Sequence, residues 1–355
     1  MQWWLKLKQN TLARFGATLL IIFYILAIGA GFFAPYAPDN AQDMGSLLPP
    51  TQIYWLDRND RFIGPHVYPT VQGPTILETG ERALEVDFSG PSPLRLFVKG
   101  DDYKLLGLIP ANIHLFGTLG EGRIHLLGTN EQGWDQFSRL LYGGQVSLFI
   151  GLVGITVSFP LGMLIGGISG YFGGWVDTIL MRLVEVLMTI PGIYLLVALA
   201  AVLPSGISST QRFLLIVLIT SFIGWAGLAR VIRGQVLSLK EREFVQAARA
   251  MGANPFYIIV RHVLPQTATY VIISATLAVP GFIVAESVLS LIGLGIKPPD
   301  ASWGNMLSSA TNASIVVLQP WLVWPPAVLI ILTVLAFNLL GDGLRDALDP
   351  RSLQR

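Results

Sequence analysis

Long apolar runs with few or no charged residues alternate with charged connections along most of this chain. Six runs reach the length of about 20 residues that an α-helix needs to cross the hydrocarbon core of a bilayer. They lie at residues 15–34, 146–169, 183–203, 213–229, 267–292 and 321–340. The pattern predicts an all-α polytopic membrane protein of six transmembrane helices, with one isolated span followed by a five-span core over residues 144–340.

The first run follows Lys6, Lys8 and Arg14, which resemble the charged start of a cleavable signal peptide. No small-residue cleavage site comes after it, and the sequence continues through Pro35. We therefore interpret residues 15–34 as a retained first span, with a cleaved signal as the alternative.

The stretch between the first two runs, residues 35–143, is too long for a plain connection. Its apolar positions alternate in short segments, as in β-strands, around polar clusters that predict turns at Asp57–Asp60 and Lys99–Asp102. The near repeat IHLFGT and IHLLGT predicts paired strands around Gly120–Gly122. We expect a β-rich insertion between spans 1 and 2, with a disordered loop as the alternative.

Lysine and arginine are distributed unevenly between alternate connections. One set is rich in both, whereas the opposite set contains only Arg212 and Lys297. The positive-inside rule assigns the rich set to the cytoplasm. We therefore predict a multi-pass protein of the cell (inner) membrane, with residues 1–14 and 341–355 in the cytoplasm and residues 35–143 outside.

Composition agrees with a membrane location, because 52% of residues are apolar and only 13% are charged. The net charge of +1 indicates no nucleic-acid partner. There is no cysteine, and the four histidines, which we expect at the surface or at interfaces, include no close pair, so we predict no metal site and no cofactor. No Gly-Lys dipeptide occurs, so the chain has no phosphate-binding loop of the Walker type.

Residues 238–265, between the fourth and fifth runs, are too charged to cross a membrane but have a strong helical pattern. Ser238 and Glu241 form a capping-box pattern that predicts a helix start. Gly252 is predicted to end this helix. An apolar stripe recurs between these points at helical spacing, formed by Phe244, Ala247, Ala248 and Met251.

A second helix is predicted directly after the first, because Asn254 and Pro255 are N-cap and first-turn signals. Pro265 is predicted to interrupt it before the fifth span. Its apolar stripe comprises Phe256, Ile259, Val260 and Val263. The two stripes fit two interpretations equally well. They either lie against the membrane interface and the ends of the spans, or seat in a groove of a partner protein.

The run QAARAMGANPFYIIVRHVLP resembles the signature of permeases of binding-protein-dependent ABC importers, which has a Glu-Ala-Ala triplet, a glycine and a terminal Leu-Pro. The matching positions are Ala247, Ala248, Gly252, Leu264 and Pro265. Gln246 stands where the family has glutamate, so hydrogen-bonding capacity is kept and the charge is lost. Glu243, one turn earlier, could replace that charge.

Four further segments are similar, in order and spacing, to the second (C-type) permease subunit of the dipeptide, oligopeptide and nickel family. They begin LLGTNEQGWDQF, GYFGGWVDTILM, ESVLSLIGLGIK and NLLGDGLRDALD. In the first of them, Asn130 and Trp134 replace the usual Asp and Arg.

This resemblance implies a non-catalytic pore subunit that pairs with a second, homologous permease subunit in the lipid bilayer. Two ATP-binding subunits would dock at the cytoplasmic segment, and an external binding protein would deliver the substrate. The implied ATPase-coupling residues are Glu243, Phe244, Gln246, Ala247, Ala248, Met251, Gly252, Leu264 and Pro265. Di- or oligopeptides are the expected substrates, with nickel or another small solute as the alternative.

Ionisable side chains and prolines within the spans are candidates for a pore or gate. Arg182 and Glu185 are spaced to form a structural ion pair or to act in transport. Glu286 fits either local hydrogen bonding or a pore-lining role. Pro191 can kink the third span for a gate or for packing, as can Pro160 and Pro280 in theirs. Gly162, Gly166, Gly167 and Gly170 predict tight helix packing.

Two rival functions stay open on the residues alone. An ion-coupled secondary transporter would carry charged or broken-helix sites in two matching halves, which are not evident here. A membrane enzyme with its site in the insertion would need an acid-base cluster, for which Asp101 and Asp102 are weak evidence.

Overall fold

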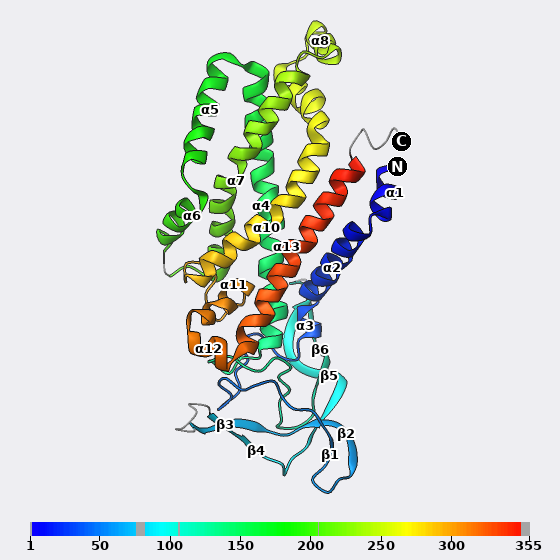
Figure 1. Cartoon of the computed structure of the whole chain (residues 1–355), viewed down its shortest axis with the longest axis vertical. Coiled ribbons are helices and arrows are strands. Elements are labelled where there is room, and N and C mark those ends of the chain that lie inside the picture. The colour runs from blue at the N-terminus through cyan, green and yellow to red at the C-terminus, as the bar shows by residue number, and fades with distance from the viewer. Residues whose placement is uncertain (1, 76–81, 106, 205, 349–355) are drawn as a thin grey trace. The chain divides into compact units, whose positions relative to one another are not determined.

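Figure 1 shows the computed structural model of the chain, which describes residues 2–75, 82–105, 107–204 and 206–348. It is mostly helical, and along the chain its strands come after the first helices and before the long helix α4. The chain forms two compact units. The first comprises Met1–Leu20, Ile150–Glu286 and Thr333–Arg355, and the second comprises Ile21–Phe149 and Ser287–Leu332.

Long apolar helices form most of the first unit, and the second unit contains the strands together with parts of α2, α4 and α13. Among the described residues, five helical stretches are long and apolar enough to cross a membrane, or six if the bent pair α5–α6 is one span. The main helices are α2 (Thr11–Ile28), α4 (Gln136–Phe172), α5 (Gly174–Thr189), α6 (Gly192–Ala201), α7 (Ser209–Leu239), α10 (Ala268–Leu291) and α13 (Pro320–Leu348). The shorter ones are α1 (Gln2–Gln9), α3 (Ala30–Phe33), α8 (Glu243–Ala250), α9 (Pro255–Ile258), α11 (Trp303–Met306) and α12 (Ala313–Leu318).

The third predicted span is not one continuous helix. Helices α5 and α6 meet at Pro191 with a bend of 84°. Pro191 is the N-cap of α6 and lacks the backbone N–H that a continuous helix would use. Pro160 and Pro280, in contrast, lie inside the unbroken helices α4 and α10. The predicted tail 341–355 continues α13 as far as residue 348, and the rest of it lies outside the described residues.

Helices α4 and α7 pack closely through glycine, as the sequence predicts. A Cβ at Gly162 would come within 2.9 Å of the backbone oxygen of Trp225, and one at Gly170 within 2.8 Å of that of Arg233. Gly166 faces the backbone of Ala229 between these two positions. Only glycine permits backbones to approach this closely, so α4 presents a smooth surface to α7.

The predicted β-rich insertion is present. A four-stranded sheet has the order β1–β2–β5–β6, and β3 pairs with β4, in both cases antiparallel. The strands are β1 (Tyr54–Leu56), β2 (Phe62–Val67), β3 (Thr70–Thr75), β4 (Arg82–Val86), β5 (Ser92–Leu105) and β6 (Ile109–Thr118). The predicted turn between β1 and β2 is confirmed, because the carboxylate of Asp57 accepts the backbone N–H groups of Asn59 and Arg61.

Two other predictions about the insertion are wrong. Residues Lys99–Asp102 do not turn but lie inside the long strand β5, at an irregularity in its pairing with β6. The second half of the near repeat forms no strand, and β6 pairs with β5 instead of with the residues after Gly120–Gly122. A polar Gly-Asp-Asp cluster is compatible with a β-bulge as well as with a turn, and only the partner strand decides between them.

Three histidines are buried in the insertion and the segment after it, so the prediction of surface positions is wrong for them. His66, His114 and His125 are each almost inaccessible to solvent. The ring of His125 lies between the carboxylate of Asp135, at 2.8 Å, and the side-chain oxygen of Gln42, at 2.7 Å. Within the described residues no group of three His, Asp or Glu side chains is arranged to hold a metal ion.

Candidate functional site

Local backbone geometry determines where the short helix α8 begins and ends. Its N-cap is Arg242, and Ser238 lies inside α7, so the capping box predicted at Ser238 is wrong. Its end is a Schellman motif, in which Gly252 N–H donates to Arg249 O at 2.9 Å and Ala253 N–H donates to Ala248 O at 3.1 Å. Gly252 has a φ of +78°, as this motif requires, so the predicted helix end is confirmed.

One face of α8 is seated on its own chain. Val245 and Ala248 are buried in a cluster that includes Tyr171 of α4, Val236 of α7 and Ile258 of α9. The Arg249 Nε–H donates to the Tyr171 hydroxyl at 3.0 Å, and the guanidinium lies 4.6 Å from the centre of that ring. The helix is therefore fixed to α4 and α7 by apolar burial and by one polar contact.

The other face of α8 is apolar and exposed. Met251 is 82% exposed and Phe244 is 41% exposed, and Ala247 between them is also exposed. The predicted stripe is thus divided: Ala248 faces the chain, together with Val245, which the stripe omitted, and the other three residues face outward. Residues spaced three or four apart are spread over a wide arc of the helix surface. The sequence pattern alone therefore does not distinguish the buried face of α8 from its exposed face.

Polar groups at the start of α8 border the exposed apolar face. Gln246 is exposed, and its Nε2 donates to Lys240 O at 3.2 Å. Glu243 lies in the first turn of the helix and is exposed. A cavity of about 770 Å³ opens beside them, lined by Leu239, Glu241, Arg242, Glu243, Phe244 and Gln266.

The connection from α8 to α10 is helical from Pro255 onward. Asn254 caps α9 by accepting the Phe256 N–H at 2.9 Å, as predicted. A π-helical stretch (Ile259–Val263) and a 3-10 stretch (Leu264–Thr267) follow, so Pro265 changes the type of helix rather than ending it. Leu264 is buried, and a Cβ at Gly167 of α4 would lie 3.2 Å from its side chain.

An ion pair joins α5 to α7. Arg233 donates from Nε and Nη2 to the two carboxylate oxygens of Asp177, each at 2.5 Å, and Ser169 Oγ also donates to Asp177. Sequence analysis did not single out these residues, because 56 positions separate Asp177 from Arg233 and nothing local connects them. Bidentate pairing of this kind fixes the relative orientation of the two helices.

Comparison with known proteins assigns the chain to a family. Residues 159–354 match the model of binding-protein-dependent transport system inner membrane components, and residues 1–50 match that of the N-terminal TM domain of oligopeptide transport permease C. The first match covers more than half of the chain and includes α8. The chain belongs to this family. It is a multi-pass inner membrane permease subunit of an ABC importer.

Named relatives of this permease are peptide transport proteins. The dipeptide transport system permease protein DppC of Bacillus subtilis is 42% identical over 64% of this chain and 69% of its own length. The oligopeptide transport system permease proteins OppC of Haemophilus influenzae (42%, over 64% and 70%) and Mycobacterium bovis (43%, over 66% and 79%) are similarly related. Neither family model matches residues 51–158, where the six strands of the described residues lie.

The candidate pore residues of the permease occupy different environments. Glu185 pairs with Arg182 at 3.0 Å, as predicted, and both side chains are largely exposed. Glu286 is fully buried in α10. Pro191 marks the break between α5 and α6. Glu185 and Pro191 lie on α5 and at its break with α6, whereas Glu286 lies on α10.

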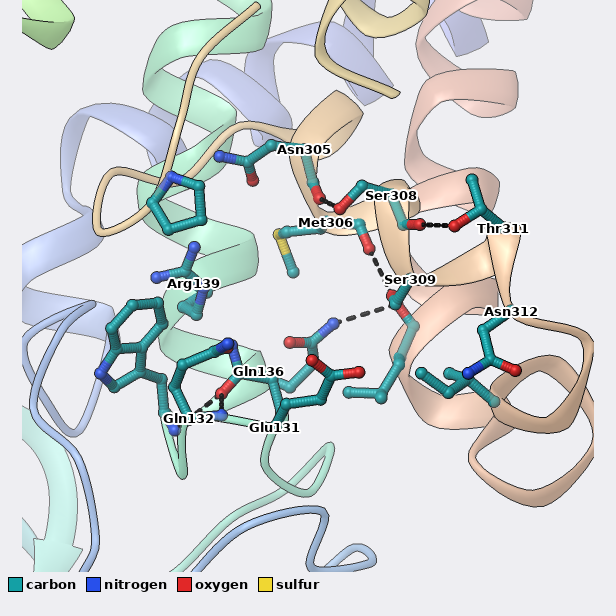
Figure 2. Close-up of a pocket in the computed structure, with 15 residues that line it drawn as sticks. Glu131, Gln132, Gln136, Arg139, Asn305, Met306, Ser308, Ser309, Thr311 and Asn312 are labelled. Atoms are coloured by element: carbon teal, nitrogen blue, oxygen red, sulfur yellow. Dashed lines mark hydrogen bonds between the residues drawn. The ribbon is translucent and has the colours of Figure 1, made fainter. Parts of the chain in front are cut away.

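A polar pocket of about 290 Å³ lies in the second unit (Figure 2). Five carboxamide side chains contribute to its lining: Asn130, Gln132, Gln136, Asn305 and Asn312. Arg139 supplies a buried guanidinium, held by the backbone oxygens of Pro38, Pro299 and Asp300, and it stacks 4.5 Å over Trp134. Asn130 and Trp134, which depart from the family pattern, both line this pocket.

Proposed function

We propose that this permease subunit imports di- or oligopeptides and that α8 is its docking helix for partner ATPases. The observation that carries the proposal is that one face of α8 is buried against its own chain and the other face is exposed. Val245 and Ala248 fix the helix to its own chain, while the apolar side chains of Phe244, Ala247 and Met251 face outward. A short helix with this arrangement suits a hydrophobic groove on a partner.

The proposed assembly follows from this docking geometry and from the family. Two ATP-binding subunits hydrolyse ATP on the cytoplasmic side, and a second, homologous permease subunit completes the pore as a heterodimer. An external binding protein delivers the substrate. In this arrangement the chain crosses the membrane six times, with α5 and α6 forming one broken span, both termini in the cytoplasm and the region 35–143 outside.

Peptides are favoured as substrates by the polar pocket and by the names of the relatives. Four of the five carboxamides also bond the chain's own backbone, those of Asn130, Gln136, Asn305 and Asn312. It is therefore the polar lining as a whole that suits a solute rich in amide donors and acceptors. Uptake of labelled di- and oligopeptides by proteoliposomes with the cognate partners, compared with uptake of Ni²⁺, tests this part. ATP-dependent uptake of Ni²⁺ without uptake of peptide would contradict it.

Docking is tested by Ala247→Glu in the assembled transporter. The substitution puts a charge on the exposed apolar face and leaves the buried face intact, so we expect the ATPase subunits to be lost on purification and ATP-dependent uptake to fall about tenfold or more. The matched control is Gln246→Glu, which adds the same charge one position away and restores the residue usual in the family. Unchanged co-purification and uptake of Ala247→Glu would overturn the role of α8.

A further inference from the structure

The exposed face of the first membrane helix continues beyond the end of α2. Ile21, Ile25 and Ile28 are exposed along one face, and Phe32 follows at the same helical spacing. Gly29 hardly interrupts this path, because its N–H donates to Ile25 O at 2.9 Å and Phe33 N–H donates to Gly29 O at 3.0 Å. The stripe therefore extends from α2 into α3.

Strand β5 places a second phenylalanine beside the end of this stripe. The ring centre of Phe97 lies 6.3 Å from that of Phe32, and Phe97 is nevertheless 65% exposed. Leu96, next to it, is exposed to a similar extent. Arg95 and Lys99 flank the pair along the strand and are exposed as well. The result is an apolar patch with basic neighbours, continuous with the exposed side of a membrane helix.

The length of α2 indicates how deep this patch lies. Eighteen helical residues rise about 27 Å, close to the roughly 30 Å thickness of the hydrocarbon core. Phe32, four residues beyond Ile28, then lies about 6 Å further, at the level of the lipid headgroups. Aromatic side chains concentrate at this level, and basic side chains there meet lipid phosphates.

Contacts with α3 hold β5 and β6 firmly at this level. Gly31 lies directly against the ring of Tyr103, where a Cβ would not fit. His114 of β6 places its Nδ1 against Ala34 O and its Nε2 3.0 Å from Asp101 O. The carboxylate of Asp101 in turn accepts Ala37 N–H at 2.7 Å. The strand pair therefore cannot move away from the helix end without breaking these contacts.

We propose that the β5 segment from Arg95 to Lys99 is a lipid-binding surface. Leu96 and Phe97 insert among the headgroups of the phospholipid bilayer, and Arg95 and Lys99 lie against lipid phosphate. The insertion is thus anchored to the membrane at two adjacent points, the helix end and this strand. The proposal depends on α2 crossing the membrane and not on the transported substrate.

Depth-dependent fluorescence quenching tests the proposal in the full-length chain. Because the sequence has no cysteine, Phe97→Cys can be labelled at a single site with an environment-sensitive fluorophore. The matched control is Phe62→Cys, since Phe62 is 71% exposed and lies on the β1–β2 hairpin, away from α3 in Figure 1. In phosphatidylethanolamine–phosphatidylglycerol vesicles with headgroup-labelled nitroxide lipid, we expect about twofold or more stronger quenching at position 97 than at position 62.

Equal and weak quenching at both positions would overturn the proposal. Shielding of position 97 that depends on adding the external binding protein, or a second copy of the chain, would identify a different occupant and would also overturn it. Leu96→Cys repeats the measurement at a neighbouring exposed position, so that a folding defect of one variant leaves the test intact.

Discussion

The segment from α8 to α9 and the β-rich insertion both expose apolar side chains, but their local structure is determined differently. Local hydrogen bonds define α8 and α9, such as Gly252 N–H to Arg249 O and the Asn254 cap on Phe256. The insertion depends on contacts between residues far apart in sequence, such as Asp101 with Ala37 and His114 with Ala34. Local geometry can therefore be read from short motifs, whereas the position of the insertion cannot.

The largest effect is expected from a charge placed on the seated face of α8. Ala248→Glu puts a carboxylate into the apolar cluster around Ile258, so we expect a loss of at least about 3 kcal/mol in the free energy of unfolding. Thermal unfolding and yield of the detergent-purified protein measure it. Ala247→Glu, on the exposed face, is the control and is expected to accumulate as the wild type does. Equal stability of the two variants would contradict the described seating of α8.

A smaller effect is expected where the insertion meets α3. Gly31→Ala brings a methyl group into the ring of Tyr103, so the strand pair must shift at a cost of about 1–3 kcal/mol. Hydrogen exchange measured by mass spectrometry should show faster exchange in β5 and β6 and little change in α8. Tyr103→Ala in the same chain removes the clash and should restore part of the protection. If exchange in β5 and β6 stays unchanged in Gly31→Ala, the contact does not hold the insertion.

A substitution at the end of α8 should lower the free energy of unfolding by about the amount that one strained residue costs. Gly252→Ala forces an L-residue to a φ of +78°, so we expect a loss of about 1–2 kcal/mol in the free energy of unfolding. No neighbouring atom would obstruct the new Cβ, so the effect isolates backbone strain from packing. Gly252→Asn is the control and should lose less, because asparagine tolerates this conformation better. Equal losses for both variants would argue against backbone strain as the cause.

The smallest effect is expected at the β1–β2 turn and depends on pH. Hydrogen bonds from the backbone N–H groups of Arg61 and Asn59 hold the pKa of Asp57 below its usual value near 3.8. A lowered pKa in the folded state means that the stabilisation is complete above the unfolded value and is lost as the pH falls through the folded value. The protection of the Asn59 and Arg61 amides, measured as the intrinsic exchange rate at each pH divided by the observed rate, should therefore fall below about pH 4. Asp57→Asn should remove this pH dependence, and an unchanged profile would contradict the role of the carboxylate.

Sequence patterns were most informative where structure is determined within one helical turn. The end of α8 at Gly252, the Asn254 cap and the Asp57 turn depend on residues at most about five positions apart, and each is present. The capping box at Ser238 shows the limit of the same approach. Ser238 and Glu241 have the right spacing, but α7 continues through Ser238 because its own apolar face is buried against α4.

By itself the sequence determined the membrane character of this protein, its family and the presence of a short helix that ends at Gly252, because length, hydropathy and short motifs suffice for these properties. Only the tertiary structure decided which face of α8 is seated and which is open, that Lys99–Asp102 continue a strand, and that His66, His114 and His125 are buried. These outcomes depend on which distant segment lies opposite each residue. A pattern along the chain does not identify the distant segment that packs against a residue, because burial and strand pairing arise only when separate segments pack together.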